Sequence, residues 1–273
     1  MPELPETETI ARDLDRLVRG ATIVRVKVPR PDVLREASPR SFAQRIRGAT
    51  IERCWRRAKL VVIDLSTADR VVVQPRFTGS LLVDDGPASS SDYTAVELAL
   101  NDGRTLRYRD VRRLGTVTLM DPRRFDQYSA TLGPEPLDPE FTAAHLSGLL
   151  RGSRQAIKKA IMDQRRLAGV GNIYANEALW RAGIDPSREA RSVPPEQVAA
   201  LHTAIVTVLH ESIDARGTTF RDFRDAYGAR GGFAARLSVY GRGGERCPRC
   251  DARLVTTHVI DGRATVLCVR CQS

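Results

Sequence analysis

Two pairs of cysteines near the C-terminus constrain the fold more than any other feature of this sequence. The pairs are CPRC at 247–250 and CVRC at 268–271. Each C-x2-C segment places two thiolates on a tight turn, and two such turns can enclose one Zn²⁺ in a tetrahedron. Four thiolates leave no open coordination position. We therefore predict a single structural zinc, bound by Cys247, Cys250, Cys268 and Cys271.

The residues between the two pairs favour a β-hairpin that carries Arg253 and Arg263. These arginines are either incidental on a hairpin that only staples the fold, or they enter a groove of a nucleic acid. His258 is an alternative ligand, although four cysteines already complete the site. Cys54 lies in an alternating, strand-like stretch, for which we expect a buried packing role.

The net charge of +10 indicates an anionic partner, with nucleic acid as the first candidate and a solvated basic surface as the alternative. No apolar run is long enough to span a bilayer, and the first residues lack the pattern of a secretory signal. We expect a cytoplasmic protein without a membrane partner. In that reducing compartment the cysteines would not form disulfides.

The order of predicted elements divides the 273 residues into several parts. A helix over 5–19 precedes a strand-rich region, in which the turn residues 101–103 predict a hairpin. Clustered prolines then indicate a linker, and helical periodicity follows it. The predicted ranges are an N-terminal domain at 1–122, a linker at 123–140, a helical domain at 141–238 and a zinc finger at 239–273.

A glycine-rich turn, AGVGNIYANEALW at 168–180, connects two predicted helices. Gly169 and Gly171 permit a tight turn, and Asn172 can cap the helix that follows. The exposed N–H groups of a helix N-terminus bind phosphate readily, and Lys158 in the preceding helix could add a cation. The alternative is a turn with a purely structural role.

The chain begins MPELPE, which has more than one interpretation. Termini usually fray, which favours a disordered tail. Removal of Met1 would instead expose the secondary amine of Pro2 beside the carboxylates of Glu3 and Glu6. Acidic residues are also common in the first turn of any helix, because they complement its dipole.

Six segments occur in a familiar order: MPELPE, RRAKLVVIDL, AGVGNIYANEALW, GTTFRDF, VYGRGGERCPRC and GRATVLCVRCQ. Through them the whole chain resembles the formamidopyrimidine-DNA glycosylase and endonuclease VIII family, and more closely its formamidopyrimidine branch. The resemblance implies an α+β multidomain fold: an N-terminal β-sandwich with a flanking helix, a helix-two-turns-helix domain and a C-terminal zinc-finger hairpin. It also implies a monomeric, nucleoid-associated base-excision repair enzyme that acts on double-stranded DNA containing an oxidised base or an abasic site.

The resemblance also implies a mechanism. A chain-terminal amine has a pKa of about 7.7–8, against about 10.4 for a lysine side chain, so it is more often neutral and nucleophilic at pH 7. The positive end of the following helix further disfavours protonation of Pro2. Pro2 would attack the sugar, expel the base and form an iminium for β,δ-elimination. Glu3 would protonate the departing sugar oxygen, and Glu6 would orient the sugar or a water.

Further residues match the family's functional positions. Lys59 matches a strand lysine that assists elimination and phosphate binding, and Arg263 matches an arginine that contacts phosphate at the lesion and assists the second elimination. With Arg263, Asn172 would grip the phosphates flanking the damaged nucleotide, beside Gly171. Lys158 matches a family lysine near the site.

Base extrusion leaves a gap in the duplex that side chains must fill. By resemblance these are Phe77, Arg112 and Leu114. The alternative for Phe77 is an ordinary surface aromatic. Gln74 and Phe77 replace the family's usual histidine and methionine, and Leu114 stands in DVRRLG where DPRRFG is usual. Gln74 can donate to phosphate but carries no charge, and Tyr93 stands near a DNA-contacting histidine position.

The lesion-capping loop should lie in RDAYGARGGF at 224–233. The sequence leaves 8-oxoguanine, formamidopyrimidines and oxidised pyrimidines open as substrates, together with the preferred opposite base. A DNA damage-binding paralogue without catalysis and an RNA-associated zinc-ribbon protein are rivals of another class. The RNA-associated rival explains the charge and the cysteines, but it does not explain the N-terminus.

Overall fold

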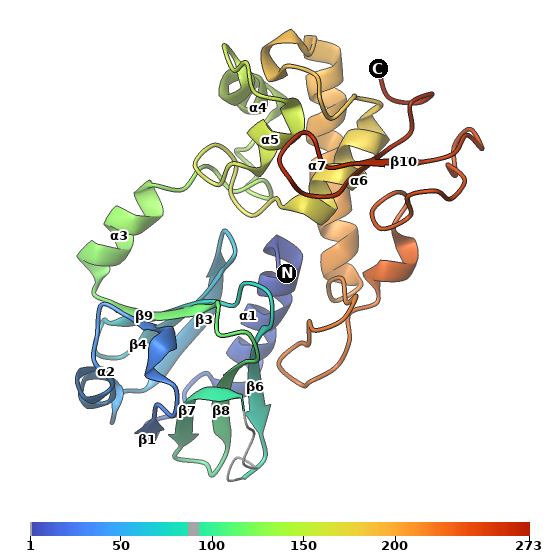
Figure 1. The fold of residues 1–273 in the computed structure, drawn as a ribbon. Coiled ribbons are helices and arrows are strands. Elements are labelled where there is room, and N and C mark those ends of the chain that lie inside the picture. The colour runs from blue at the N-terminus through green and yellow to red at the C-terminus, as the bar shows by residue number, and fades with distance from the viewer. Residues whose placement is uncertain (1, 87–92) are drawn as a thin grey trace. The chain divides into compact units, whose positions relative to one another are not determined.

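The computed structural model describes residues 2–86 and 93–273, which form two compact units (Figure 1). The first unit runs to Ala130 and also includes Ala215–Ala234. The second consists of Thr131–Asp214 and Ala235–Ser273, so the cysteine-containing segment belongs to it. The range 215–234, which we placed in the helical domain, is thus part of the first unit.

Two sheets build the first unit. The four-stranded sheet has the order β1-β7-β8-β6, and the five-stranded sheet has the order β2-β9-β5-β4-β3. All neighbouring strands are antiparallel except β2 and β9, which are parallel. The strands are β1 (Ile23–Lys27), β2 (Leu34–Arg35), β3 (Ile51–Arg57), β4 (Leu60–Leu65), β5 (Arg70–Gln74), β6 (Gly79–Asp84), β7 (Thr94–Leu100), β8 (Thr105–Asp110) and β9 (Thr116–Met120). Buried side chains of both sheets form one core, which confirms the predicted β domain.

Helix α1 (Leu4–Val18) packs on this core through one apolar face. Ile10, Leu14 and Val18 are fully buried at helical spacing, as the periodicity predicts. Pro5 suits the first turn, where its missing N–H costs nothing, and Gly20 ends the helix with a φ of +82°. Helix α2 (Pro39–Ile46), which we did not predict, is capped by Ser38, whose hydroxyl accepts from Ser41 N.

The proline-rich range 123–140, which we predicted to be a linker, is partly helical. It contains most of helix α3 (Pro122–Ala130), in which the Asp121 carboxylate accepts from Arg124 N at 2.8 Å. Phe125 of α3 is buried, lies edge-on to Trp55 of β3 and carries the Arg70 guanidinium over its ring. An aspartate cap followed by proline explains this helix locally, and packing on the sheet holds it.

The second unit combines helices with a small hairpin. Its helices are α4 (Ala143–Leu150), α5 (Ile157–Met162), α6 (Asn172–Ala182) and α7 (Pro195–Asp214), and its hairpin pairs β10 (Val255–Thr257) with β11 (Thr265–Leu267). Short 3₁₀ helices occur at Pro31–Val33 in the first unit, at Ala190–Ser192 in the second, and at Phe233–Arg236, where the chain passes from the first unit to the second. α6 packs on α7, where the buried hydroxyls of Tyr174 and Ser212 lie 2.6 Å apart. The predicted helical region and cysteine hairpin are confirmed.

Among residues 2–86 and 93–273, no helix combines the length and apolar character that crossing a membrane would require.

Candidate functional site

The start of α1 holds the predicted nucleophile and its neighbouring acid. Pro2 is buried, and the Glu3 side chain is only 1% exposed. Glu3 N donates to Glu6 Oε2 at 2.8 Å, and Thr7 Oγ1 donates to Glu3 O at 2.9 Å, so the first turn fixes the Glu3 backbone. Met1, whose removal we expect, lies outside the described residues. A buried carboxyl held beside Pro2 can supply a proton to a reacting group there.

Glu6 links α1 to a segment distant in sequence. Its Oε1 accepts from Thr218 N at 2.7 Å, while Oε2 accepts from Glu3 N. Gly217 has a φ of +84°, and a Cβ at this position would lie 3.1 Å from Glu6 Cγ. The predicted role of Glu6 in orienting a sugar or water stays a prediction. The structure shows a bracing role between α1 and residues 217–218.

The predicted lesion-capping range begins in the same segment of the first unit. Asp225 Oδ1 accepts from Ala229 N at 2.8 Å, and its Oδ2 accepts from the Arg216 guanidinium, which also contacts Asp13 at 2.6 Å. Burial raises the pKa of Asp13, although Arg216 opposes this shift. The range is therefore anchored by buried carboxylates, while Tyr227 is 57% exposed at its tip.

Lys59 lies in the tight turn between β3 and β4 rather than within a strand. The preceding Ala58 has a left-handed φ of +52°, which is strained for alanine. Thr7 Oγ1 lies 3.5 Å from Ala58 O, so this turn packs against the first turn of α1. The half-buried Lys59 is thus held on the same side of the first unit as Pro2 and Glu3.

Two loops present the residues predicted to fill the duplex. The β5–β6 loop carries Phe77 (43% exposed), and the β8–β9 loop carries Arg112 and Leu114 (42% exposed). The Arg112 guanidinium lies 4.9 Å from the centroid of the Phe77 ring, so the structure brings the two loops together. In each loop an arginine with a left-handed backbone, Arg76 or Arg113, precedes the exposed apolar residue.

The buried carboxylate of Asp110 joins these loops. Its Oδ1 accepts from Thr78 Oγ1 in the first loop, and its Oδ2 accepts from Gly115 N at 2.8 Å in the second. Thr78 Oγ1 accepts in turn from Arg112 N at 2.9 Å. A Cβ on Gly115 would lie 1.9 Å from the Tyr108 hydroxyl, so only glycine fits at that position. No local sequence signal identifies Asp110.

Asp110→Asn is expected to loosen both loops. The asparagine side chain keeps one acceptor oxygen, but its NH₂ group replaces the other oxygen and so faces a group, Thr78 O–H or Gly115 N–H, that itself donates. A buried group left unsatisfied in this way costs about 1–3 kcal/mol of stability. Urea denaturation measures the free energy of unfolding. Asp126→Asn is the matched control, since the side chain of Asp126 is 75% exposed. Equal stability of the two variants would contradict the role given to Asp110.

The two remaining predicted contact residues of the first unit lie at the ends of strands. Gln74 ends β5, pairs with Thr116 of β9 and lines a surface hollow together with Tyr128. Tyr93 is 40% exposed, and the Arg109 guanidinium lies 5.3 Å from its ring centroid. Both side chains are accessible, and their contacts with DNA stay predictions. Cys54 is 5% exposed in the core, where burial raises the pKa of its thiol, as its expected packing role requires.

The four predicted metal ligands converge in the second unit. All four Sγ atoms lie within 4.8 Å of one another, with 4.0 Å between Cys247 and Cys271 and 3.4 Å between Cys250 and Cys268. Thiolates at about 2.3 Å from a tetrahedral ion would be about 3.8 Å apart, so the cluster fits one four-coordinate metal. Burial opposes ionisation of Cys247, but backbone N–H groups of Arg249 and Cys250 lower its pKa to about 6.

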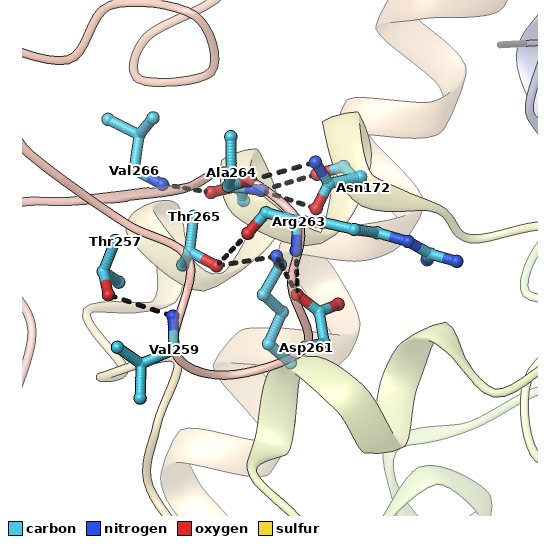
Figure 2. Close-up of polar contacts among 10 residues, drawn as sticks. Asn172, Thr257, Val259, Asp261, Arg263, Ala264, Thr265 and Val266 are labelled. Atoms are coloured by element: carbon cyan, nitrogen blue, oxygen red, sulfur yellow. Dashed lines mark hydrogen bonds and ion pairs between the residues drawn. The ribbon is translucent and has the colours of Figure 1, made fainter.

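Helix α6 holds the cysteine hairpin in place. Gly171, and not Asn172, is the N-cap of α6, and the Asn172 side chain instead donates to Ala264 O at 3.0 Å. One turn later, Asn176 Oδ1 accepts from Val266 N at 2.7 Å. The expectation that Asn172 caps the helix is thus wrong, because its amide reaches the hairpin (Figure 2).

Two further contacts of α6 involve residues that the sequence pattern does not single out. The buried Glu177 carboxylate accepts from the N–H groups of Ser238, Val239 and Tyr240 at 2.8–2.9 Å, where the chain approaches the cysteines. The Arg249 guanidinium lies 4.4 Å from the ring centroid of Trp180. No local sequence signal points to either contact, because the partners are far apart along the chain.

Arg263 and Lys158, the two cationic residues predicted near the phosphates, differ in their exposure to solvent. Arg263 is exposed between β10 and β11, as predicted, and Arg253 and His258 are exposed as well. His258 is not part of the cysteine cluster. Lys158, in contrast, is fully buried, and its Nζ donates to Thr265 Oγ1 at 2.7 Å. The expectation that Lys158 presents its charge to DNA disagrees with this burial.

Comparisons with known proteins relate this arrangement of sheets, helices and cysteine hairpin to DNA glycosylases. Models of the formamidopyrimidine-DNA glycosylase N-terminal domain and of its H2TH domain match residues 1–117 and 132–224. The chain is 41% identical to formamidopyrimidine-DNA glycosylase of Chloroflexus aggregans (100% of this chain, 98% of the relative) and 43% identical to that of Moorella thermoacetica (93% of each).

Solved structures give the same assignment. A Lactococcus lactis Fpg mutant in complex with DNA containing Fapy-dG matches with a TM-score of 0.93 and 30% identity over all of both chains. The complex of Lactococcus lactis Fpg with DNA containing an abasic site also has a TM-score of 0.93, at 29% identity over 99% of both chains. This chain therefore belongs to the formamidopyrimidine-DNA glycosylase family, which confirms the predicted resemblance and fold class.

Proposed function

We propose that this protein excises oxidised purines, 8-oxoguanine and formamidopyrimidines, from double-stranded DNA and then cleaves the abasic site by β,δ-elimination. The observation that carries the proposal is the buried Glu3 carboxyl directly after Pro2, at the N-terminal end of α1. Relatives bound to DNA with Fapy-dG or an abasic site support this choice of substrate. A monomeric state and a cytoplasmic, nucleoid-associated location are predictions that accompany the proposal.

In the proposed reaction, Pro2 N, exposed by removal of Met1, forms a bond to C1′ as the glycosidic bond breaks, and the base leaves with the proton that Pro2 N gives up. Glu3 protonates O4′ as the sugar ring opens, which leaves a positively charged iminium. Loss of a C2′ proton expels the 3′ phosphate, and loss of a C4′ proton then expels the 5′ phosphate. Water finally hydrolyses the iminium and releases Pro2. A secondary amine suits this series of reaction steps, because the iminium that it forms is positively charged without binding a proton.

Other residues support the reaction by binding and positioning DNA. Lys59, on the turn against α1, assists elimination and binds phosphate. Arg263 contacts phosphate at the lesion and assists the second elimination, while Gly171 and Asn172 lie where α6 meets the hairpin that carries Arg263. Phe77, Arg112 and Leu114 fill the gap left by the extruded base, and their exposure on two joined loops supports this role.

We assign the metal at the cysteine cluster as one structural Zn²⁺. Four sulfur ligands are typical of closed zinc sites and leave no position for a reacting water. The zinc would hold the two C-x2-C turns together, and no step of the proposed reaction involves it.

Borohydride trapping on duplexes with single defined lesions tests the proposal. A covalent adduct on 8-oxoguanine, formamidopyrimidine and abasic duplexes, but not on undamaged DNA, is the expected result. Adducts only on oxidised pyrimidines and abasic sites would favour an endonuclease-VIII-like substrate range. If no duplex is trapped, the protein is a damage-binding paralogue and the proposal fails. Affinity should also fall steeply with salt, since the contacts neutralise phosphates.

Glu3→Gln is expected to lower base excision on 8-oxoguanine duplexes by about 10²–10⁴-fold, the usual contribution of a general acid. The variant should retain far more activity on a preformed abasic site, because the abasic sugar is a hemiacetal that opens to its aldehyde without enzymatic protonation of O4′. Single-turnover rates on the two substrates measure the difference. Glu52→Gln, at an exposed position of β3, is the control. Equal losses on both substrates would contradict the acid role of Glu3.

A further inference from the structure

Lys158 is fully buried although its charge requires compensation. Its Nζ lies 3.3 Å from Asp261 Oδ1 and donates to Thr265 Oγ1 at 2.7 Å. The Asp261 side chain is itself only 10% exposed. A buried ammonium is tolerated when a carboxylate and hydrogen-bond acceptors surround it. The positive charge of Lys158 is therefore neutralised inside the protein, whereas its neighbour Lys159 is exposed.

The two partners of Lys158 also hold the backbone of Arg263 on both sides. Asp261 Oδ1, which accepts from Lys158 Nζ, also accepts from Arg263 N at 3.1 Å. Thr265 Oγ1, which accepts from Lys158, donates to Arg263 O at 3.4 Å. One carboxylate oxygen and one hydroxyl thus connect the buried ammonium to the N–H and the C=O of a single residue (Figure 2).

The side chain of Arg263 takes no part in these contacts. It is exposed, and Figure 2 shows it extending away from Asp261 and Thr265. The next residue, Ala264, is held by Asn172 of α6 through its carbonyl. The backbone on which the guanidinium stands is therefore fixed from α5 and from α6, while the guanidinium itself stays accessible.

We propose that Lys158 is a positioning residue, which fixes the turn at 261–265 so that Arg263 meets a DNA phosphate in one orientation. The inference rests on the proposed function, in which Arg263 contacts phosphate. It differs from a direct role of Lys158 in binding DNA, because a fully buried ammonium with internal partners neutralises no phosphate.

A double-mutant cycle on DNA affinity tests this role. The variants are Lys158→Met, Arg263→Ala and their combination, with Lys159→Met as the control for losing one lysine from α5. Affinity for a duplex with a tetrahydrofuran abasic-site analogue is measured over a range of salt concentrations. We expect each single variant to bind about tenfold more weakly, the scale of one charge-assisted hydrogen bond. The double variant should bind no more weakly than Arg263→Ala, with the same salt dependence.

Additive losses would overturn the proposal. The slope of log affinity against log salt concentration provides a second criterion. If this slope is smaller in magnitude by about 0.9 in the double variant than in Arg263→Ala, Lys158 neutralises a phosphate of its own and the proposal is overturned. Amide hydrogen exchange, followed by NMR without DNA, provides a second readout. Exchange at Arg263 N–H should accelerate in Lys158→Met and stay unchanged in Lys159→Met. Unchanged exchange in Lys158→Met would contradict the positioning role of Lys158 and would leave the proposed function untouched.

Removing a buried ammonium can also unfold the hairpin, so a milder variant is required. Thr265→Val keeps the ion pair and removes one of the two connections to Arg263. It should keep its zinc and still show faster exchange at Arg263 together with weaker DNA binding; slow exchange and wild-type binding would contradict the proposal. If Arg263→Ala binds as the wild type does, the contact assigned to Arg263 in the proposed function is wrong, and this role of Lys158 fails with it.

Discussion

Pro2→Gly is expected to lower both base excision and borohydride trapping by about 10³-fold. Loss of a catalytic nucleophile elsewhere costs about 10⁶-fold, and glycine retains a primary amine, so a smaller loss is expected. An imine formed by a primary amine must bind a proton before it can accept electrons, whereas the iminium of proline is already charged. Glycine also removes the buried ring that fixes the amine beside Glu3. Single-turnover kinetics on 8-oxoguanine and abasic duplexes measure both effects.

Pro139→Gly is the matched control, because it makes the same chemical change at an exposed position of the second unit. It should retain wild-type rates. Pro2→Gly with wild-type rates and folded-state stability would show that the reaction does not depend on the proline ring or its secondary amine.

Cys268→Ser is expected to abolish metal binding, from about one zinc per chain to none, and to unfold the hairpin that carries Arg263. The buried Cys268 packs in one cluster with Trp180, so the loss should shift Trp180 emission toward that of an exposed indole. Trp55, the other tryptophan, donates to Asp64 in the first unit and should be unaffected. DNA affinity should fall by about 100-fold, because one contact from the hairpin and one from α6, each worth about tenfold, are lost together.

Cys54→Ala provides the control, because it removes a cysteine from the first unit and leaves the four ligands in place. It should retain zinc, Trp180 emission and DNA affinity. Zinc content comes from metal analysis of the purified protein. A metal-free Cys268→Ser protein that binds damaged DNA as tightly as Cys54→Ala would contradict the role assigned to the hairpin.

The sequence predicted features whose causes are local. The apolar face of α1, the turn at 101–103 and the two C-x2-C turns each depend on residues within a few positions of one another, and the structure contains all of them. The residues Asp121 and Pro122 carry an equally local helix-start signal for α3, which the clustered prolines that follow obscured. Local signals therefore account for most of the elements.

Long-range contacts between polar side chains could not be predicted in the same way. Glu6 binds the backbone of Thr218, and Lys158 contacts Asp261, in each case across a large part of the chain. Glutamate in a first helical turn and lysine in a basic helix are both ordinary surface residues by pattern. Only the packed structure shows that Lys158 is buried and that Glu6 braces two segments.

The joined loops of the first unit illustrate the same limit. The family resemblance identified Phe77, Arg112 and Leu114, since they occupy matching positions in the motif. It did not identify Asp110, whose carboxylate connects the loops, because its importance depends on Thr78 and Gly115 approaching it in space. Residues whose importance depends on geometry were missed, whereas residues at motif positions could be named from the sequence, and their roles stay predictions.

The central claim is that the terminal amine of Pro2 bonds to deoxyribose. Tandem mass spectrometry of the borohydride-reduced protein–DNA conjugate, after digestion of both polymers, tests it most directly. We predict a chain that lacks Met1, with the reduced sugar fragment on the nitrogen of Pro2. A fragment located on Lys59 or another side chain, or a reacted chain that still carries Met1, would contradict the mechanism.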